Sequence, residues 1–287
     1  MRWSLARAKI NLSLHVSGRR ADGYHDLESL VAFGGVGDWI GFEPADRLEL
    51  EIEGSSAAAS GPVDDNLVLR AARELASRIP DVRLGRFRMV KLLPVAAGLG
   101  GGSADAAAAL RLIAEANGLP LDDARIRAAA AATGADVTVC LNPRARLMTG
   151  AGETVSPPLP LDRLFAVLVN PRVATATHDV FAEYDRSDPY DASGEAKSLA
   201  PAAPSRIGAE ALAAARNDLQ AAAIAVTPVI AEVLASLSRL PGMLLTRMSG
   251  SGATCFALFD ARESAAMGGS RIRAERPDWW ASAMSLR

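Results

Sequence analysis

Apolar and polar residues alternate along the first predicted element of the chain. Between residues 6 and 16, the apolar residues occupy every second position: Ile10, Leu12, Leu14 and Val16. The polar residues occupy the positions between them: Lys9, Asn11, Ser13 and His15. A period of two predicts a β-strand, because successive side chains point to opposite faces. The polar face either meets solvent, or it holds Lys9 and Asn11 together in a polar cleft, where a lysine supplies a compact charge beside a phosphate or hydroxyl.

The hydrophobic pattern predicts further strands and helices along the rest of the chain. Strands are expected at residues 27–33, 39–42, 47–52, 83–93, 137–141, 146–148, 164–169, 243–248 and 254–259. Helices are expected at residues 66–78, 104–117, 123–132 and 209–237, the last interrupted at Pro228 because proline lacks a backbone donor. Residues 185–205, rich in Asp, Ser, Pro and Ala, predict a surface excursion. The mixed order predicts an α+β fold of two domains, residues 1–154 and 155–287.

A glycine-rich loop lies between the strand expected at 83–93 and the helix expected at 104–117. Four of the five residues at 98–102 are glycine, and Ser103 follows them. Glycine lets backbone N–H groups approach a ligand closely, and a helix N-terminus favours an anion, so the loop predicts a phosphate cradle. The alternative is a tight structural turn. Serine at position 103, where a dinucleotide-binding loop has glycine or alanine, argues against a dinucleotide site. The loop is not followed by Gly-Lys-Ser or Gly-Lys-Thr, which argues against a Walker-type P-loop, and the chain has no HRD or DFG motif, which argues against a protein kinase.

Composition narrows the classes of function. The 287 residues are enough for one large or two modest domains, and the net charge of −2 without a long basic block argues against nucleic acid as the main partner. Arg2, Arg7 and Lys9 interrupt any signal-peptide core, and no uncharged apolar run of membrane-spanning length occurs. Cys140 and Cys255 lie in apolar runs and are expected to be buried free thiols in a reducing, cytoplasmic compartment. Three histidines and no Cys-x-x-Cys argue against a structural zinc site.

Three segments, in order along the chain, resemble the motifs of the GHMP kinase superfamily of small-molecule kinases. They are Lys9-Ile10-Asn11-Leu12, residues 94–104 and residues 248–253. Residues 19–25, 64–67 and 134–137 are similar to the branch that phosphorylates the 2-hydroxyl of 4-diphosphocytidyl-2-C-methyl-D-erythritol in the non-mevalonate isoprenoid pathway. The resemblance covers nearly the whole chain. It implies two α+β domains with the active site in the cleft between them, ATP and Mg²⁺ as cofactors, and no nucleic acid, membrane or obligate protein partner.

The resemblance also implies roles for particular residues. It makes Asp136 the catalytic base and Lys9 its assistant. The implied ATP-binding residues are Asn66, Pro94, Val95, Ala96, Ala97, Gly98, Leu99, Gly100, Gly101, Gly102, Ser103 and Ala104, and Ser103 is also the implied Mg²⁺ ligand. The implied substrate-binding residues are Asn11, Tyr24, His25, Thr177, Phe181, Gly250 and Gly252, with the two aromatic rings stacking on the cytosine and His25 hydrogen-bonded to it.

Several of these residues have a structural alternative. Asp136 is also explained as a turn residue, Ser103 and Asn66 as helix N-caps, Phe181 as core packing, and residues 249–252 as a β-turn. Asp105 stands where the superfamily branch usually has asparagine, and an acid there is expected to point away from the phosphates or to lie near the metal. Two other functions stay open: a kinase of mevalonate or homoserine, and a catalytically silent nucleotide binder.

Overall fold

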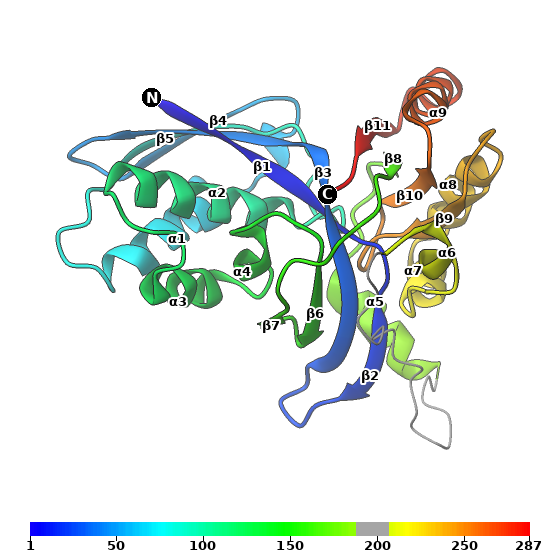
Figure 1. Ribbon diagram of the computed structural model, residues 1–287, viewed down its shortest axis with the longest axis horizontal. Coiled ribbons are helices and arrows are strands. Elements are labelled where there is room, and N and C mark those ends of the chain that lie inside the picture. The colour runs from blue at the N-terminus through cyan, green and yellow to red at the C-terminus, as the bar shows by residue number, and fades with distance from the viewer. Residues whose placement is uncertain (188–206) are drawn as a thin grey trace. The chain divides into compact units, whose positions relative to one another are not determined.

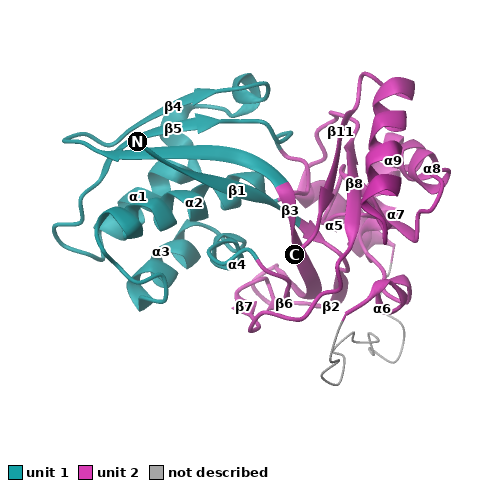
Figure 2. Ribbon diagram, turned by 45° about the horizontal axis from the view of Figure 1, so that its top comes forward, with its two compact units in different colours: residues 1–9, 36–95, 100–143 teal, residues 10–35, 96–99, 144–287 magenta. Residues whose placement is uncertain are grey.

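The computed structural model describes residues 1–187 and 207–287, so most of the excursion expected at 185–205 lies outside the described residues. The chain forms two compact α+β units (Figure 2). Unit 1 comprises residues 1–9, 36–95 and 100–143, and unit 2 comprises residues 10–35, 96–99 and 144–287. The expected α+β fold class is confirmed. The domain boundary expected between residues 154 and 155 stays a prediction, and the compact units divide the chain at other points.

In unit 1, a sheet is built on the second half of β3 (His25–Pro44). The strand β3 pairs with β1 (Arg2–Asn11) and, in antiparallel orientation, with β5 (Gly85–Val90). The strand β5 pairs in parallel with β4 (Glu49–Glu53). Phe87 and Met89 are fully buried, whereas Arg86 and Arg88 on the other face are exposed. This alternation buries one face of the sheet against the helices of the unit (Figure 1).

The helices of unit 1 are α1 (Leu67–Ala76), α2 (Gly101–Ala116), α3 (Ala124–Thr133) and the short α4 (Val137–Cys140). The α2 helix packs against the other three, and its alanines at positions 104, 106, 107, 108, 109 and 114 are buried. Small side chains allow the neighbouring helices to approach closely, so one buried helix can organise the unit.

The expectation for residues 137–141 was wrong: the β-branched run there forms α4 rather than a strand. The run extends from a chain turn whose backbone already has helical geometry at Asp136, and this local start outweighs the strand preference of valine and threonine. The α2 helix also begins earlier than expected, at Gly101, with Gly100 as its N-cap.

Unit 2 contains the remaining strands of the same seven-stranded sheet and a second sheet of four strands. The first half of β3 pairs antiparallel with β2 (His15–Arg19) and with β6 (Arg146–Gly150), and β6 pairs with β7 (Thr154–Val155). The second sheet has the order β11-β8-β10-β9 and is antiparallel. Its strands are β8 (Phe165–Asn170), β9 (Leu245–Met248), β10 (Cys255–Phe259) and β11 (Trp280–Ser285). The strands β8 and β10 are buried along their whole length.

The helices of unit 2 are α5 (Thr177–Arg186), α6 (Ala209–Ala213), α7 (Gln220–Val226), α8 (Val229–Ser238) and α9 (Arg262–Glu275). Ile230 of α8 and Ile272 of α9 join Val167 and Ala257 of the second sheet in one hydrophobic core. The helix expected over 209–237 is therefore three helices. Besides the expected interruption at Pro228, which caps α8, the chain leaves the helix between α6 and α7.

The strand expected over residues 6–16 is two strands, since β1 ends at Asn11 and β2 begins at His15. The polar face of this segment does not meet solvent, because Lys9, Asn11, Ser13 and His15 are each at most 5% exposed. The strands expected at 27–33 and 39–42 are one continuous strand, β3. Both cysteines are free and buried, as expected.

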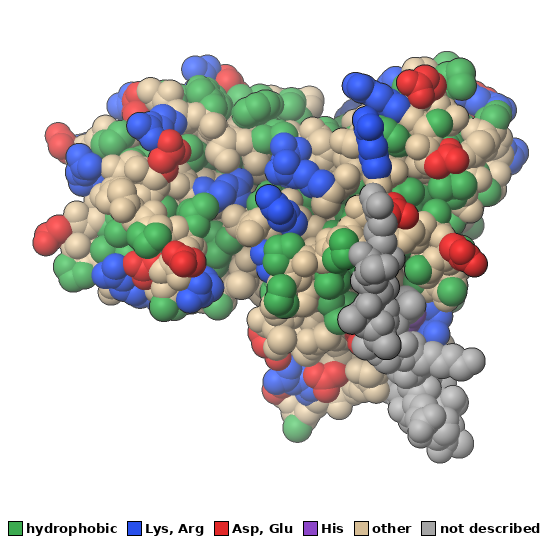
Figure 3. Space-filling model, viewed as in Figure 1, with side chains coloured by type: hydrophobic (Ala, Val, Ile, Leu, Met, Phe, Trp, Pro, Cys, Tyr) green, Lys and Arg blue, Asp and Glu red, His purple; other side chains and the backbone are tan. Residues whose placement is uncertain are grey.

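The surface carries charges of both signs. On the face in Figure 3, Lys and Arg side chains lie beside Asp and Glu side chains, in keeping with a net charge of −2. None of the helices in the described residues combines the length and the apolar character that crossing a membrane requires.

Candidate active site

Lys9 and Asp136 form an ion pair in unit 1. The Lys9 Nζ donates a hydrogen bond of 2.9 Å to Asp136 Oδ2, although the two residues lie 127 positions apart. The Lys9 side chain is 7% exposed and the Asp136 side chain 35% exposed, so a buried ammonium lies behind an accessible carboxylate. Asp136 precedes α4 as its N-cap residue but makes no side-chain capping bond. A carboxylate placed in this way can accept a proton from a hydroxyl group.

The N-terminus of α2 lies beside this pair. The backbone N–H groups of Gly101, Gly102 and Ser103 have no hydrogen-bond acceptor among the described residues, and the first turn carries no acidic side chain. Unpaired N–H groups and the helix dipole make such an end attractive to anions. A Cβ placed on Gly100, whose φ is +60°, would lie 3.2 Å from both Cβ and Cε of Lys9. The stem of Lys9 therefore joins the Asp136 carboxylate to this helix end.

Ser103 is the third residue of α2 and not its N-cap, so the capping alternative for Ser103 was wrong. Its hydroxyl makes no hydrogen bond within the described part of the chain. Asn66, in contrast, is the N-cap of α1, and its Oδ1 accepts a hydrogen bond from the Val68 N–H. The N-cap interpretation therefore describes Asn66, and its contact with adenine stays a prediction.

The middle of the glycine-rich loop, residues 96–99, packs within unit 2 against the second glycine cluster. The Ser249 hydroxyl donates to the Gly98 carbonyl at 2.9 Å, and the Thr254 N–H donates to the Ala97 carbonyl. A Cβ on Gly98, whose φ is +72°, would lie 2.5 Å from the Ser249 carbonyl oxygen, so only glycine fits there. Ala97 and Leu99 are buried, whereas Ala96 is exposed. In unit 1, Pro94 is half-buried, Val95 is exposed and Ala104 is buried.

The second glycine cluster, residues 249–252, is held by polar side chains of unit 2. The Asn217 Nδ2 donates to the carbonyls of Met248 and Gly250, each at 2.8 Å. The Ser249 hydroxyl accepts a hydrogen bond from the Asn11 N–H. A Cβ on Gly250 would lie 3.3 Å from the Asn11 Oδ1, so Gly250 and Asn11 are neighbours. Gly252 closes the turn by donating its N–H to the Ser249 carbonyl. Asn217 belongs to no sequence motif and was not among the expected site residues.

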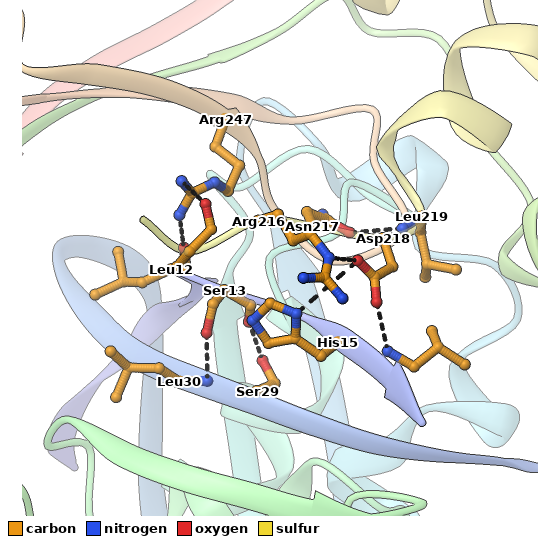
Figure 4. Close-up of polar contacts among 12 residues, drawn as sticks. Leu12, Ser13, His15, Ser29, Leu30, Arg216, Asn217, Asp218, Leu219 and Arg247 are labelled. Atoms are coloured by element: carbon orange, nitrogen blue, oxygen red, sulfur yellow. Dashed lines mark hydrogen bonds and ion pairs between the residues drawn. The ribbon is translucent and has the colours of Figure 1, made fainter. Parts of the chain in front are cut away.

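Asn11 and Ser13 are buried in a hydrogen-bonded network, of which Figure 4 shows a part. The Asn11 Nδ2 donates to Ser29 Oγ, and Ser29 donates in turn to the Ser13 carbonyl. The Arg247 guanidinium donates to the carbonyls of Leu12, Leu212 and Ala215. Burial lowers the pKa of Arg247 to about 10. These bonds fix the backbone that carries Asn11.

His25, Tyr24 and Phe181 also lie in unit 2. The rings of His25 and Phe181 are stacked, with centroids 4.6 Å apart. Phe181 packs in addition against the hydrophobic core, so its structural alternative holds in part. Tyr24 is accessible to solvent, since this residue is 66% exposed. Thr177 begins α5 and its hydroxyl lies 2.8 Å from the Ser251 hydroxyl.

Asp185 lies beside His25 and was not among the expected site residues. The His25 Nε2 lies 2.7 Å from Asp185 Oδ1, and Arg19 lies 3.3 Å from the other carboxylate oxygen of Asp185. An aspartate in this position orients the imidazole ring and fixes the proton on Nε2. Asp185 was expected at the start of the surface excursion, whereas the structure places it on α5, one helical turn after Phe181.

A third group of buried polar residues, Asp38, Lys91 and Asp105, lies in unit 1 and is called the Lys91 cluster below. The Lys91 Nζ donates to Asp38 Oδ2 and to Asp105 Oδ2, both at 2.6 Å. All three residues are at most 5% exposed. Burial raises the pKa of Asp105 to about 7. Asp105 thus points into the unit, bonded to Lys91, and its position relative to the phosphates and the metal stays a prediction.

Comparison with known proteins places this chain among kinases. Residues 66–143 match the GHMP kinases N terminal domain family, and residues 199–274 match the GHMP kinases C terminal family. A protein of Methylobacterium radiotolerans named 4-diphosphocytidyl-2-C-methyl-D-erythritol kinase is 54% identical over 284 residues, which cover 98% of both chains. A protein of Xanthobacter autotrophicus with the same name is 54% identical over 295 residues and also covers 98% of both.

Solved structures agree. A crystal structure of a 4-(cytidine 5'-diphospho)-2C-methyl-D-erythritol kinase matches with a TM-score of 0.80 and 29% identity, covering 99% of each chain. The mevalonate kinase of L. major shares the fold, with a TM-score of 0.65 at 15% identity over 99% of this chain and 96% of its own. Because both family matches occur in order and the relatives are more than half identical over nearly the full length, the chain belongs to the 4-diphosphocytidyl-2-C-methyl-D-erythritol kinases, a family of small-molecule GHMP kinases.

Proposed function

We propose that the protein transfers the γ-phosphoryl group of ATP to the 2-hydroxyl of 4-diphosphocytidyl-2-C-methyl-D-erythritol. The observation that carries the proposal is the Lys9–Asp136 ion pair beside the free N–H groups of α2. Phosphoryl transfer needs a phosphate cradle and a group that manages the hydroxyl proton, and this region of unit 1 offers both. Relatives named for this substrate, 54% identical over almost the whole chain, support the choice of acceptor.

Asp136 acts in this proposal as the general base. Its carboxylate accepts the proton of the substrate hydroxyl, the oxygen attacks the γ-phosphorus, and the bond to the β-phosphate oxygen breaks to release ADP. Lys9 holds the carboxylate in place through a charge-assisted hydrogen bond of 2.9 Å. The same ammonium stabilises negative charge that develops on the attacking oxygen.

The phosphates of ATP bind at the N-terminus of α2. The N–H groups of Gly101, Gly102 and Ser103 supply donors there without competing acceptors among the described residues. Mg²⁺ neutralises phosphate charge when bound, and the Ser103 hydroxyl is the protein group proposed to hold it. The described residues contain no cluster of three His, Cys, Asp or Glu side chains suited to a metal, which fits a cation held largely by phosphates and water.

The cytosine base is bound in unit 2 by Tyr24, His25 and Phe181. The exposed Tyr24 ring offers a face for stacking, and His25 offers a polar edge whose orientation Asp185 fixes. Asn11, Thr177, Gly250 and Gly252 are assigned to the remainder of the substrate. Stacking on an aromatic ring suits a base because every base has an apolar face.

A direct assay tests this function. ADP release is measured with ATP, Mg²⁺ and one alcohol at a time: the cytidine-diphosphate-linked methylerythritol, mevalonate or homoserine. We expect turnover with the first alcohol alone, and a product whose phosphate is at the 2-position by NMR. Turnover with mevalonate or homoserine instead would assign a different kinase. ATP-analogue binding without turnover of any alcohol would identify a nucleotide-binding homologue that lacks activity.

A further inference from the structure

The Lys91 cluster connects three parts of unit 1. Asp38 lies on β3 and is fully buried, Lys91 follows β5 directly, and Asp105 lies on α2. Asp38 uses both carboxylate oxygens: Oδ1 accepts from the N–H groups of Leu92 and Leu93, and Oδ2 accepts from Lys91 Nζ. The Lys91 backbone is also fixed, because its N–H donates to the Glu53 carbonyl and its carbonyl accepts from the Ser56 N–H.

Both ends of the glycine-rich loop are attached to this cluster. Leu92 and Leu93, which lead into the loop, are bonded to Asp38, and α2, which leaves it, is bonded through Asp105 to Lys91. The cluster also lies directly behind the first residue of the helix. A Cβ on Gly101 would lie 3.3 Å from Lys91 Nζ and 3.8 Å from Asp38 Oδ2.

Stability alone does not account for charged groups at this place. Burying ions costs several kcal/mol each, and an apolar group of the same volume often stabilises a core more than an ion pair does. Two carboxyl groups also share one ammonium, and burial disfavours the charged form of Asp105, whose pKa is raised to about 7. What the cluster provides is geometry, because charge-assisted hydrogen bonds hold their partners at short and fixed distances.

We propose that Asp105 is a positioning residue for ATP: through Lys91 and Asp38 it fixes the separation of the two ends of the glycine-rich loop and thereby holds the free N–H groups of α2 in place for the phosphates. This inference rests on the proposed function, because it takes the N-terminus of α2 as the phosphate site. Ordering a loop before the ligand arrives removes that entropic cost from binding, so the cluster raises the affinity for ATP.

The test compares Asp105→Ala with Asp105→Asn in the full chain. The alanine variant separates α2 from Lys91 and leaves Lys91 and Asp38 as a balanced pair, so the core keeps no extra charge. The asparagine variant retains an oxygen that accepts from Lys91. We expect Asp105→Ala to raise the KM for ATP and the calorimetric Kd of a non-hydrolysable ATP analogue about tenfold or more, and Asp105→Asn to stay within about threefold of the wild type.

Three further measurements separate positioning from general stability. The KM for the alcohol substrate is expected to change less than about threefold in Asp105→Ala. Amide hydrogen exchange of Ala104, whose N–H donates to the Gly100 carbonyl, is expected to quicken. The matched control is Asn117→Ala, which removes the side-chain bonds between the other end of α2 and Arg83. It is expected to lower the Tm without changing the Kd of the ATP analogue. Asp105→Ser, whose shorter side chain does not reach Lys91, replaces the alanine variant if that protein does not fold.

The inference is overturned if Asp105→Ala binds the analogue as tightly as the wild type. It is equally overturned if Asp105→Asn is as defective as Asp105→Ala, if both KM values rise together, or if Asn117→Ala reproduces the ATP defect. A wild-type protein that binds no ATP analogue contradicts the proposed function itself, which distinguishes that failure from a failure of the Lys91 cluster alone.

Discussion

Lys9 uses both parts of its side chain. The stem packs beside Gly100, and the ammonium, 7% exposed, reaches Asp136. Lysine is rare in this chain, occurring only at positions 9, 91 and 197, yet the first two are buried hydrogen-bond donors to carboxylates. A compact ammonium on a flexible stem fits such narrow places, whereas a planar guanidinium needs more room.

The first prediction concerns Asp136. Asp136→Asn keeps the size of the side chain but removes the proton acceptor, so kcat is expected to fall by roughly 10²–10⁴-fold. The KM for ATP is expected to change little, because Asp136 makes no contact with the phosphate cradle other than through Lys9. Steady-state kinetics measure both. The control is Asp123→Asn. Asp123 is the N-cap of α3 in the same unit, and asparagine can also cap a helix. Equal losses of kcat in the two variants would contradict the assignment of Asp136.

The second prediction concerns Tyr24. If its exposed ring stacks on the base, Tyr24→Ala is expected to weaken substrate binding by roughly 1–3 kcal/mol, about five- to 150-fold in KM. Tyr24→Phe is expected to retain most of the affinity, because the ring face makes the contact. The KM values for both substrates are measured in the three proteins. A change confined to the KM for ATP would move Tyr24 to the nucleotide side.

Single residues differed in how far the sequence revealed them. Lys9, Asp136 and the glycines belong to recognisable motifs, so they could be named in advance. Asp38 lies on β3 and Lys91, 53 positions later, follows β5. No spacing rule predicts a contact between two residues so far apart in the sequence. Asp185 and Asn217 act through side chains that position their neighbours, and that role leaves no pattern in one sequence.

At the scale of the element, α2 shows how a helix can begin in glycine. Residues 101 and 102 have low helix propensity, and this is why the sequence predicted a start at Ala104. Tertiary packing outweighs that preference, since buried alanines of α2 fill the middle of unit 1. The same glycines leave the N–H groups accessible. The element type was predictable, but its first turn was not.

The third prediction compares the two glycines that flank α2. Gly100 and Gly118 both have left-handed backbones, with φ of +60° and +65°. Alanine in either place costs about 1–2 kcal/mol of stability, because a Cβ is disfavoured there. A Cβ on Gly118 meets no atom within 4 Å, whereas one on Gly100 presses on Lys9. We expect Gly100→Ala to lose at least about tenfold in kcat/KM and Gly118→Ala to keep wild-type kinetics at a similar Tm. Equal kinetics in the two variants would make the loop merely structural.

At the scale of the whole molecule, buried ionisable groups make stability depend on pH. His15 is 2% exposed, and its ring nitrogens have no hydrogen-bond partner in the described chain; Nδ1 lies 3.9 Å from Asp218 Oδ1. Burial lowers the pKa of His15, partly opposed by Asp218 and reinforced by Arg216. The unfolded chain therefore binds the proton more readily than the folded one. The contribution of neutral His15 to stability is complete above the unfolded pKa of about 6.5 and declines as the pH falls through it.

The fourth prediction follows from this sign. Between pH 8 and pH 5.5, the free energy of unfolding of the wild type is expected to fall more steeply than that of His15→Gln, by up to about 1.4 kcal/mol per pH unit below pH 6.5. Urea unfolding at each pH measures the difference. His178, whose side chain is 91% exposed, provides the control, since His178→Gln is expected to match the wild-type slope. Parallel curves for wild type and His15→Gln would contradict the prediction.

The order in which the chain passes between the two units limits how genes for this protein can recombine. The backbone passes from one compact unit to the other after Lys9, Gly35, Val95, Leu99 and Pro143, so neither unit is encoded by one uninterrupted stretch of the gene. A single recombination between two related genes cannot exchange one unit whole; it always leaves a hybrid in at least one of them. A crossover between β1 and β6 also gives the strand β3, which contributes to both units, a pairing neighbour from the other parent. The two halves of this kinase are therefore expected to be inherited together, and functional chimaeras should be confined to parents whose β3 partners are alike.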